Sequence, residues 1–168
     1  MSQIYAGINI SESSKLSVNP ISKVKSVPKR NILDTNVIIS IIEDPLYAYN
    51  FKKNFPNDAK FVTTEKMWEE AERKTGLKSK VIKWTIKNHL GEIQTIRATT
   101  KLQSFAYSIQ CKTSSKCHWP DSILVVLGIW FEWTIVTHDH DLLKTCQYFK
   151  LDSMRPVSSG LNSCKGGK

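Results

Sequence analysis

The sequence predicts an α/β fold built around a parallel β-sheet. Short apolar runs that suit buried strands alternate along the chain with segments of helical periodicity, which is the pattern of strand-helix-strand units. The chain has 168 residues, of which 40% are hydrophobic and 23% are charged. This length and composition predict one globular domain with a substantial core and leave little room for a second full domain.

The first predicted strand and helix share residues 31–42, which are apolar nearly throughout. Such a run is expected where a buried strand continues directly into a buried helix. Asp34 falls at the carboxyl end of the strand. Thr35 or Asn36 is expected to cap the helix, and Pro45 to help end it.

The next elements continue the alternation of strand and helix. Residues 47–55 are predicted to form a short helix, residues 60–63 the second strand, and residues 65–75 a helix that Gly76 ends. Residues 78–90 predict an amphipathic basic helix, because apolar side chains recur there at helical spacing and lysines occupy the other positions.

The last part of the chain repeats the pattern. An apolar helix is expected to carry Pro120 in its first turn, where the missing N–H costs nothing. The predicted elements, in order, are a helix within residues 95–110, a polar loop at 112–116, the apolar helix at 119–130, a strand at 133–137, a short helix from near His140, and a strand at 154–158.

Basic residues are concentrated in particular parts of the chain. The net charge of +9 at pH 7 indicates a polyanionic partner. Residues 73–116 carry ten Lys/Arg and one Glu, so this insert alone is +9, while residues 1–30 carry +4 and residues 150–168 carry +3. For a single lysine, a solvated helix face is the simpler interpretation. Taken together, the lysines are suited to binding the phosphates of a nucleic acid.

The domain organisation follows from the same composition. Residues 1–30 predict a basic, disordered N-terminal arm, residues 31–158 the folded domain, and residues 159–168 a flexible tail. No run approaches the roughly 20 apolar residues of a membrane helix, and the first thirty residues lack the apolar stretch of a secretory signal. We therefore expect a cytoplasmic protein without a membrane partner, whose four cysteines are reduced.

Four acidic residues stand in separate contexts, each at the edge of an apolar run: Asp34, Glu70, Asp121 and Asp139. In an open parallel sheet, sites form outside the carboxyl ends of the strands. Asp34 and Asp139 are expected at two such ends, Glu70 one to two turns into a helix, and Asp121 at the start of another. All four can then line one crevice, where carboxylate oxygens suit Mg²⁺ or Mn²⁺ acting on a phosphodiester.

These acids lie in four segments whose order resembles that of a known family. The segments are Leu33-Asp34-Thr35-Asn36-Val37, Thr63-Thr64-Glu65-Lys66-Met67-Trp68-Glu69-Glu70-Ala71, Asp121-Ser122-Ile123-Leu124, and Thr137-His138-Asp139-His140-Asp141-Leu142. Together they resemble the motifs of the PIN-domain nucleases, in particular VapC-like ribonucleases. The resemblance covers roughly residues 31–158.

The resemblance implies a fold, a cofactor and a function. It implies a three-layer α/β/α sandwich with a mostly parallel sheet, and Mg²⁺ or Mn²⁺ held by Asp34, Glu70, Asp121 and Asp139 as catalytic acids. Asp141 would be a supporting ligand. The implied activity is hydrolysis of single-stranded RNA to products with 5′-phosphate and 3′-hydroxyl ends. Many small members are toxins that dimerise and bind an antitoxin, whereas others process ribosomal or messenger RNA.

Two details of this assignment concern the adjacent glutamates and the histidines beside Asp139. Glu69 and Glu70 point about 100° apart on a helix, so only one can face a metal. We expect it to be Glu70, which shares a helix side with the apolar Met67. His138 and His140 are less typical of the family, and we interpret them as surface or loop histidines.

Other functions stay open at this stage. The chain could be a PIN-like module that binds RNA or a protein without cutting, or a DNA-directed nuclease of related fold. A zinc site is a weaker alternative, because its spacing is unlike that of common zinc motifs; its ligands would be Cys111, Cys117, His118 and Cys146. Most tryptophans are expected in the core, whereas Trp119, after a polar loop, is a candidate for stacking on a base.

Overall fold

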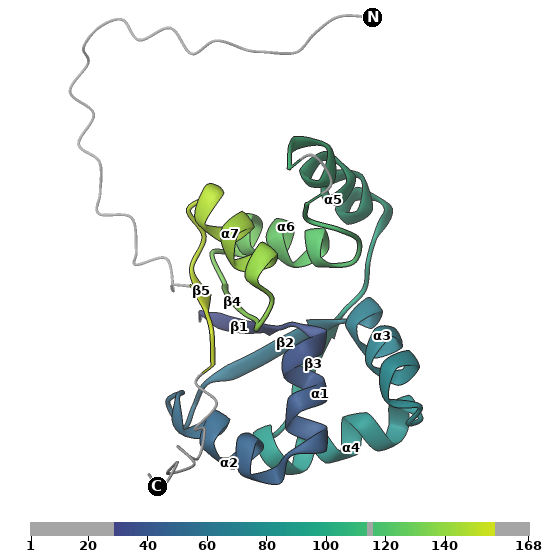
Figure 1. Ribbon diagram of the computed structural model, residues 1–168, viewed down its shortest axis with the longest axis vertical. Coiled ribbons are helices and arrows are strands. Elements are labelled where there is room, and N and C mark those ends of the chain that lie inside the picture. Colours follow the sequence, from purple (N-terminus) through teal and green to yellow (C-terminus); the bar gives the residue numbers. More distant parts are fainter. Residues whose placement is uncertain (1–28, 114–115, 157–168) are drawn as a thin grey trace, which may run out of the picture.

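A single five-stranded sheet forms the centre of the molecule (Figure 1). The computed structural model describes residues 29–113 and 116–156. All strand pairs are parallel, and the order across the sheet is β3-β2-β1-β4-β5. The strands are β1 (Arg30–Leu33), β2 (Lys60–Thr64), β3 (Ile93–Ile96), β4 (Thr134–Val136) and β5 (Ser153–Met154).

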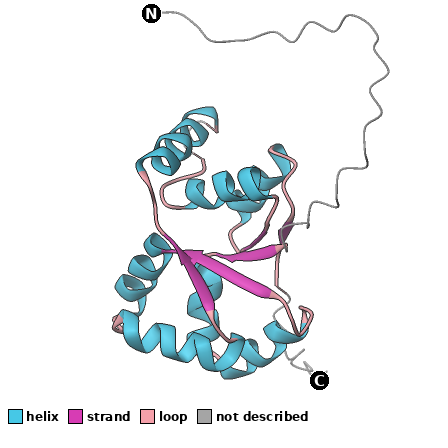
Figure 2. Ribbon diagram, turned by 180° about the vertical axis from the view of Figure 1, so that it is seen from behind, coloured by secondary structure: helices cyan, strands magenta, loops and turns pink. Residues whose placement is uncertain are grey.

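Helices cover both faces of the sheet (Figures 1 and 2). One layer contains α1 (Thr35–Glu43), α2 (Pro45–Lys53), α3 (Glu65–Thr75) and α4 (Ser79–Leu90). The other layer contains α5 (Thr100–Lys112), α6 (Asp121–Phe131) and α7 (His140–Tyr148). The predicted α/β fold, with three layers and a parallel sheet, is therefore confirmed.

The strand order creates a switch in direction between β1 and β4. From β1 the chain builds β2 and β3 on one side, and it then returns to add β4 and β5 on the other side. In open α/β sheets, ligands bind in the crevice outside the carboxyl ends of the strands at such a switch point. Asp34 follows β1 and Asp139 lies three residues after β4, so both acids are placed at this location.

The core fills both interfaces between the sheet and the helices. Ile32 and Leu33 of β1 are fully buried, as expected for a central strand covered on both faces. Helix α6 is buried from Ser122 to Gly128, whereas its C-terminal end is more exposed. A Cβ at Gly128 would lie 3.1 Å from Ile135 Cδ1 of β4, so the glycine allows the helix to approach the sheet closely.

Most elements lie where the sequence predicts them, but one strand was missed. Residues 93–96 form the edge strand β3, and the following helix starts at Thr100, inside the predicted range, and continues to Lys112. Asp34, and not Thr35 or Asn36, occupies the N-cap of α1. Pro120 occupies the N-cap of α6 and not its first turn.

Parts of the predicted organisation fall outside the described residues. Nearly all of the predicted N-terminal arm, residues 1–28, lies outside them, as do residues 157–168, which include the predicted tail. Arg30, the last residue of the predicted arm, belongs to β1. Within the described ranges, none of the helices has the length and apolar character needed to cross a membrane.

Candidate functional site

Asp34 and Thr137 form the centre of the candidate site, at the ends of the neighbouring strands β1 and β4. The register pairs Leu33 with Val136, and the Asp34 amide donates to the Val136 carbonyl at 3.1 Å. Thr137 is fully buried, and its hydroxyl donates to Asp34 Oδ2 at 2.6 Å. Burial raises the pKa of the Asp34 carboxyl; the Thr137 hydrogen bond opposes this, and the charges of Asp139 and Glu70 add to the rise.

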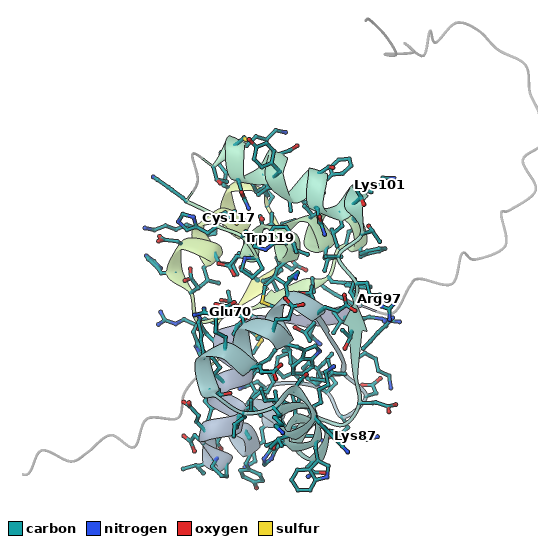
Figure 3. The ribbon with its side chains drawn as sticks, turned by 90° about the vertical axis from the view of Figure 1, so that its right-hand side faces the viewer. Glu70, Lys87, Arg97, Lys101, Cys117 and Trp119 are labelled. Atoms are coloured by element: carbon teal, nitrogen blue, oxygen red, sulfur yellow. The ribbon has the colours of Figure 1, made fainter. Side chains whose placement is uncertain are left out.

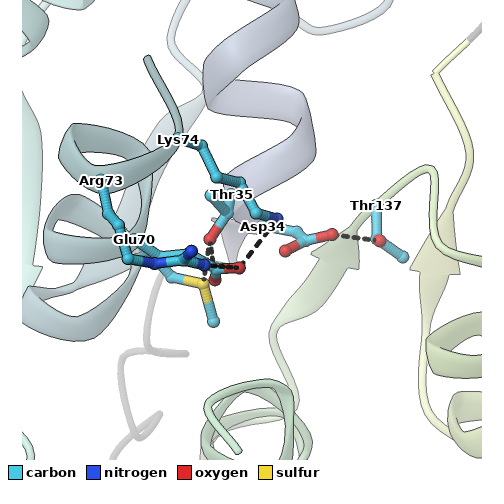
Figure 4. Close-up of polar contacts among 7 residues, drawn as sticks. Asp34, Thr35, Glu70, Arg73, Lys74 and Thr137 are labelled. Carbon is cyan, nitrogen blue, oxygen red and sulfur yellow. Dashed lines mark hydrogen bonds and ion pairs between the residues drawn. The ribbon is translucent and has the colours of Figure 1, made fainter. Parts of the chain in front are cut away.

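Glu70 reaches the same edge from the second turn of α3 (Figure 4). The Thr35 hydroxyl donates to Glu70 Oε2 at 2.8 Å and also lies 2.8 Å from the sulfur of Met67. Because Thr35 is the first residue of α1, this contact fixes Glu70 beside Asp34. Glu69 lies on the exposed side of the helix, where Lys66 Nζ approaches its carboxylate at 2.6 Å.

Two basic residues of α3 accompany Glu70 into the site. Lys74 Nζ lies 2.8 Å from Glu70 Oε1, in the i,i+4 arrangement that favours a glutamate followed by a lysine. Arg73 is more distant, with a nitrogen 3.9 Å from the same oxygen, and its side chain is largely exposed. The ammonium of Lys74 thus occupies one oxygen of a predicted metal ligand.

Asp121 begins α6 in the opposite helix layer and is electrostatically coupled to the other three acids. Burial raises the pKa of its carboxyl to about 7, with further contributions from Asp34, Glu70 and Asp139. The positive charge of Lys74 acts in the opposite direction. A carboxyl with such a pKa lies in a region of excess negative charge and restricted solvation.

Asp139 is held by its own helix. Its Oδ1 accepts the amide of Leu142 at 2.7 Å as the N-cap of α7, and its amide donates to the Thr137 hydroxyl at 2.9 Å. The second oxygen of this carboxylate is not used by the cap. The four acids predicted from the sequence therefore surround the carboxyl ends of β1 and β4.

Asp141 does not join this group. It lies in the first turn of α7 with its side chain 68% exposed, and its nearest cation is Lys144, whose Nζ is 3.9 Å away. Two residues along a helix rotate the side chain by about 200°, so Asp139 and Asp141 face different directions. Asp141 lines a separate cavity.

The four carboxylates fit a hard divalent cation in chemistry but not in their present arrangement. Acceptor-only oxygens and mutual repulsion are features that Mg²⁺ or Mn²⁺ would satisfy. However, within residues 29–113 and 116–156, no group of three or more His, Cys, Asp or Glu side chains is arranged to hold a metal ion. Shared ligation would require the side chains to move closer and Glu70 to release Lys74.

The histidines around Asp139 differ from each other. His140 is exposed, as predicted. His138 is half-buried, and its Nε2 lies 2.7 Å from the hydroxyl of Tyr47, a residue of α2. Burial lowers the pKa of His138, so its ring is largely neutral at pH 7. The Tyr47 contact was not predicted, because the two residues are 91 positions apart.

The cysteines and tryptophans have mixed locations. Cys117 and Cys146 are buried, whereas Cys111 is exposed, and the described residues contain no group of His, Cys, Asp or Glu side chains that could hold zinc. Trp119 is partly exposed, as expected for a candidate stacking residue, but Trp84 is 66% exposed and does not pack in the core.

Comparison with known proteins concerns the fold alone. No protein-family model and no curated protein matches the chain. Among solved structures, it is similar to a chain of VapBC2 from Rickettsia felis, determined bound to a DNA fragment from their promoter. The TM-score is 0.56 and the identity 15%, and the match covers 74% of this chain and 96% of that chain. This likeness is consistent with the PIN-like sandwich predicted from the motifs.

Proposed function

We propose that the protein is a metal-dependent endoribonuclease that cleaves single-stranded RNA. The observation that carries the proposal is the convergence of Asp34, Glu70, Asp121 and Asp139 at the switch point of the sheet, where Asp121 is coupled to the other three acids. Carboxyls whose pKa is raised by burial, here Asp34 and Asp121, are typical of a functional site when they lie in such a crevice. The net charge of +9 suits a polyanionic substrate.

Hydrogen bonds within the site orient two of its four carboxylates. Thr137 fixes one oxygen of Asp34, and Thr35 fixes one oxygen of Glu70. Asp34 is buried, so its own carboxylate has little contact with bulk water. A bound Mg²⁺ or Mn²⁺ would supply an activated water and stabilise the charge that develops on the leaving oxygen. Asp34, Glu70, Asp121 and Asp139 would hold that ion.

The wider assignment is also part of the proposal. The likeness to VapBC2 supports a toxin that binds an antitoxin protein, and homodimerisation and a cytoplasmic location are expected with it. An RNA-processing role would use the same site. A DNA-directed nuclease is less well supported, because residues 29–113 and 116–156 form few elements beyond the sandwich.

A cleavage assay on single-stranded RNA tests the proposal. We expect cleavage that requires Mg²⁺ or Mn²⁺, stops with a chelator, and falls at least about 100-fold in Asp34→Asn, which keeps the shape of the side chain. Asp58→Asn makes the same chemical change at an exposed loop and should leave the rate unchanged. Equal cleavage by wild type and Asp34→Asn would refute the mechanism.

A module that binds RNA without cutting it is the second candidate. The ion pair between Lys74 and Glu70 favours it, as does the absence of a ready metal-holding group among the described residues. RNA binding without cleavage at any divalent cation concentration would support this alternative.

A further inference from the structure

A basic cavity outside the acidic site is lined by residues of α7, by the C-terminal end of α5 and by Lys116. Its volume is about 290 Å³. The lining residues are Lys112, Thr113, Lys116, Asp141, Lys144, Thr145 and Tyr148. Three of these side chains are lysines from separate turns of the chain, so the fold gathers their charges at one place.

The positive charge of this cavity is largely uncompensated. Asp141 is the one acid among the lining residues, and its distance of 3.9 Å from Lys144 marks a weak ion pair between two largely exposed side chains. Within the described part of the chain, neither Lys112 nor Lys116 has an ion-pair partner. The cavity is therefore ready to accept an anion.

An aromatic ring borders the same cavity. Tyr148 is 71% exposed, and its one close ring contact is an edge-on arrangement with Phe149, with centroids 4.9 Å apart. A flat ring that is open to solvent beside lysines is the combination that single-stranded nucleic acids use, because bases stack on the ring while lysines hold the phosphates. An acidic peptide would bind through the lysines alone and would not need the ring.

The cavity is connected to the acidic site through buried side chains. Thr145, which lines the cavity, is hydrogen-bonded to the thiol of Cys117, and that buried thiol also lies within electrostatic reach of Asp121 and Asp139. Figure 3 shows Cys117 in the layer of α5 to α7, above Glu70. Lys87 of α4 lies at the far end of the opposite layer.

We propose that this cavity is a subsite for single-stranded RNA, in which the three lysines hold backbone phosphate and Tyr148 stacks on a base. The inference rests on the proposed function for its substrate class, and it names where the strand continues beyond the acids. It also divides the basic insert of residues 73–116 into two parts. Lys112 and Lys116 would bind RNA, whereas the lysines of α4 would be a solvated face.

Binding in the absence of divalent cations tests the subsite separately from catalysis. The probe is a fluorescent 12-nucleotide oligouridine, measured by anisotropy in EDTA at several salt concentrations. We compare Lys112→Gln/Lys144→Gln with Lys80→Gln/Lys87→Gln, which removes the same charge from α4. The cavity variant should bind about tenfold more weakly, with a salt slope lower by about 1.4, because each lost phosphate contact on a single strand contributes about 0.7.

The outcomes separate this inference from the proposed function. Tyr148→Ala should weaken binding about fivefold without changing the salt slope. Equal losses in the two lysine variants would overturn the subsite, as would equal affinity for a poly-glutamate peptide of the same charge. If the wild-type protein cleaves RNA but the cavity variant binds RNA as tightly as wild type, the subsite proposal is wrong and the nuclease proposal stands. If the cavity variant loses binding as expected but the wild-type protein does not cleave RNA, the subsite proposal stands and the nuclease proposal is wrong.

Discussion

The hydroxyl of Thr137 donates to Asp34 Oδ2 at 2.6 Å, and Thr137 Oγ1 also accepts a hydrogen bond from the amide of Asp139 at 2.9 Å. One buried side chain therefore connects two acids of the site that are 105 positions apart in the sequence. A hydrogen bond to a charged group is among the stronger ones in proteins. Thr137 thus sets the position of the carboxylate on which the proposed chemistry depends.

Thr137→Val should weaken both stability and activity. The valine keeps the shape of the side chain but leaves a buried carboxylate oxygen and an amide without their partner. We expect the free energy of unfolding to fall by about 2 kcal/mol, and the cleavage rate by about tenfold. Urea denaturation and single-turnover cleavage measure the two effects. Thr137→Ser retains the hydroxyl and should restore most of both; a serine variant as impaired as valine would contradict this role.

Lys74 is expected to compete with a divalent cation for Glu70. Its ammonium lies 2.8 Å from Glu70 Oε1, so a cation that binds this oxygen must displace it. Lys74→Gln should therefore bind Mn²⁺ several-fold more tightly in calorimetric titration. Arg73→Gln is the matched control, because its nitrogen lies 3.9 Å away and its side chain is exposed. Weaker binding in Lys74→Gln would show that this lysine supports the site instead of competing for it.

The adjacent pair Glu69 and Glu70 offers a direct test of site assignment. Only Glu70 is hydrogen-bonded to Thr35, whereas Glu69 is paired with Lys66 on the exposed side of α3. We expect Glu70→Gln to lower cleavage by about 100-fold and Glu69→Gln to change it less than twofold. Cleavage rates of the two variants at saturating Mg²⁺ decide the matter, and a larger loss in Glu69→Gln would reverse the assignment.

The raised pKa of Asp121, about 7, predicts a pH dependence of stability in the metal-free protein. The folded state then binds a proton more tightly than the unfolded chain, whose carboxyl titrates near 4. Stability from this group is complete below pH about 4 and is lost as pH rises toward about 7. Urea unfolding in EDTA across this range should show a steeper decline for wild type than for Asp121→Asn. If the free energy of unfolding depends on pH in the same way in wild type and Asp121→Asn, the raised pKa of Asp121 is contradicted.

Local patterns predicted much of the fold and the four acids. Residues 60–63 and 133–137 read as buried strands because they are apolar and flanked by helical segments, and both lie in the sheet. The edge strand β3 was missed because it has four residues, of which Gln94 and Thr95 are exposed. Ile93 and Ile96 are three residues apart and do not follow the period-2 pattern of a strand, so the pairing with β2 decides the conformation.

The contacts within the site were less predictable than its residues. Thr137 and Asp34 are joined through the adjacency of β1 and β4, which no local pattern reveals. Asp34 occupies the N-cap of α1 without a side-chain cap hydrogen bond, and the hydroxyl of Thr35 contacts Glu70. The Lys74 contact had a readable signal, since glutamate and lysine four residues apart on a helix favour an ion pair.

The central claim is that Asp34, Glu70, Asp121 and Asp139 share a divalent cation. A crystal structure obtained with Mn²⁺, using its anomalous scattering, measures this most directly. We predict an anomalous peak bonded to carboxylate oxygens of Asp34 and Asp121, with Glu70 released from Lys74. A protein that shows no peak among these four acids at millimolar Mn²⁺, or a peak elsewhere with the Lys74 contact intact, would contradict the account.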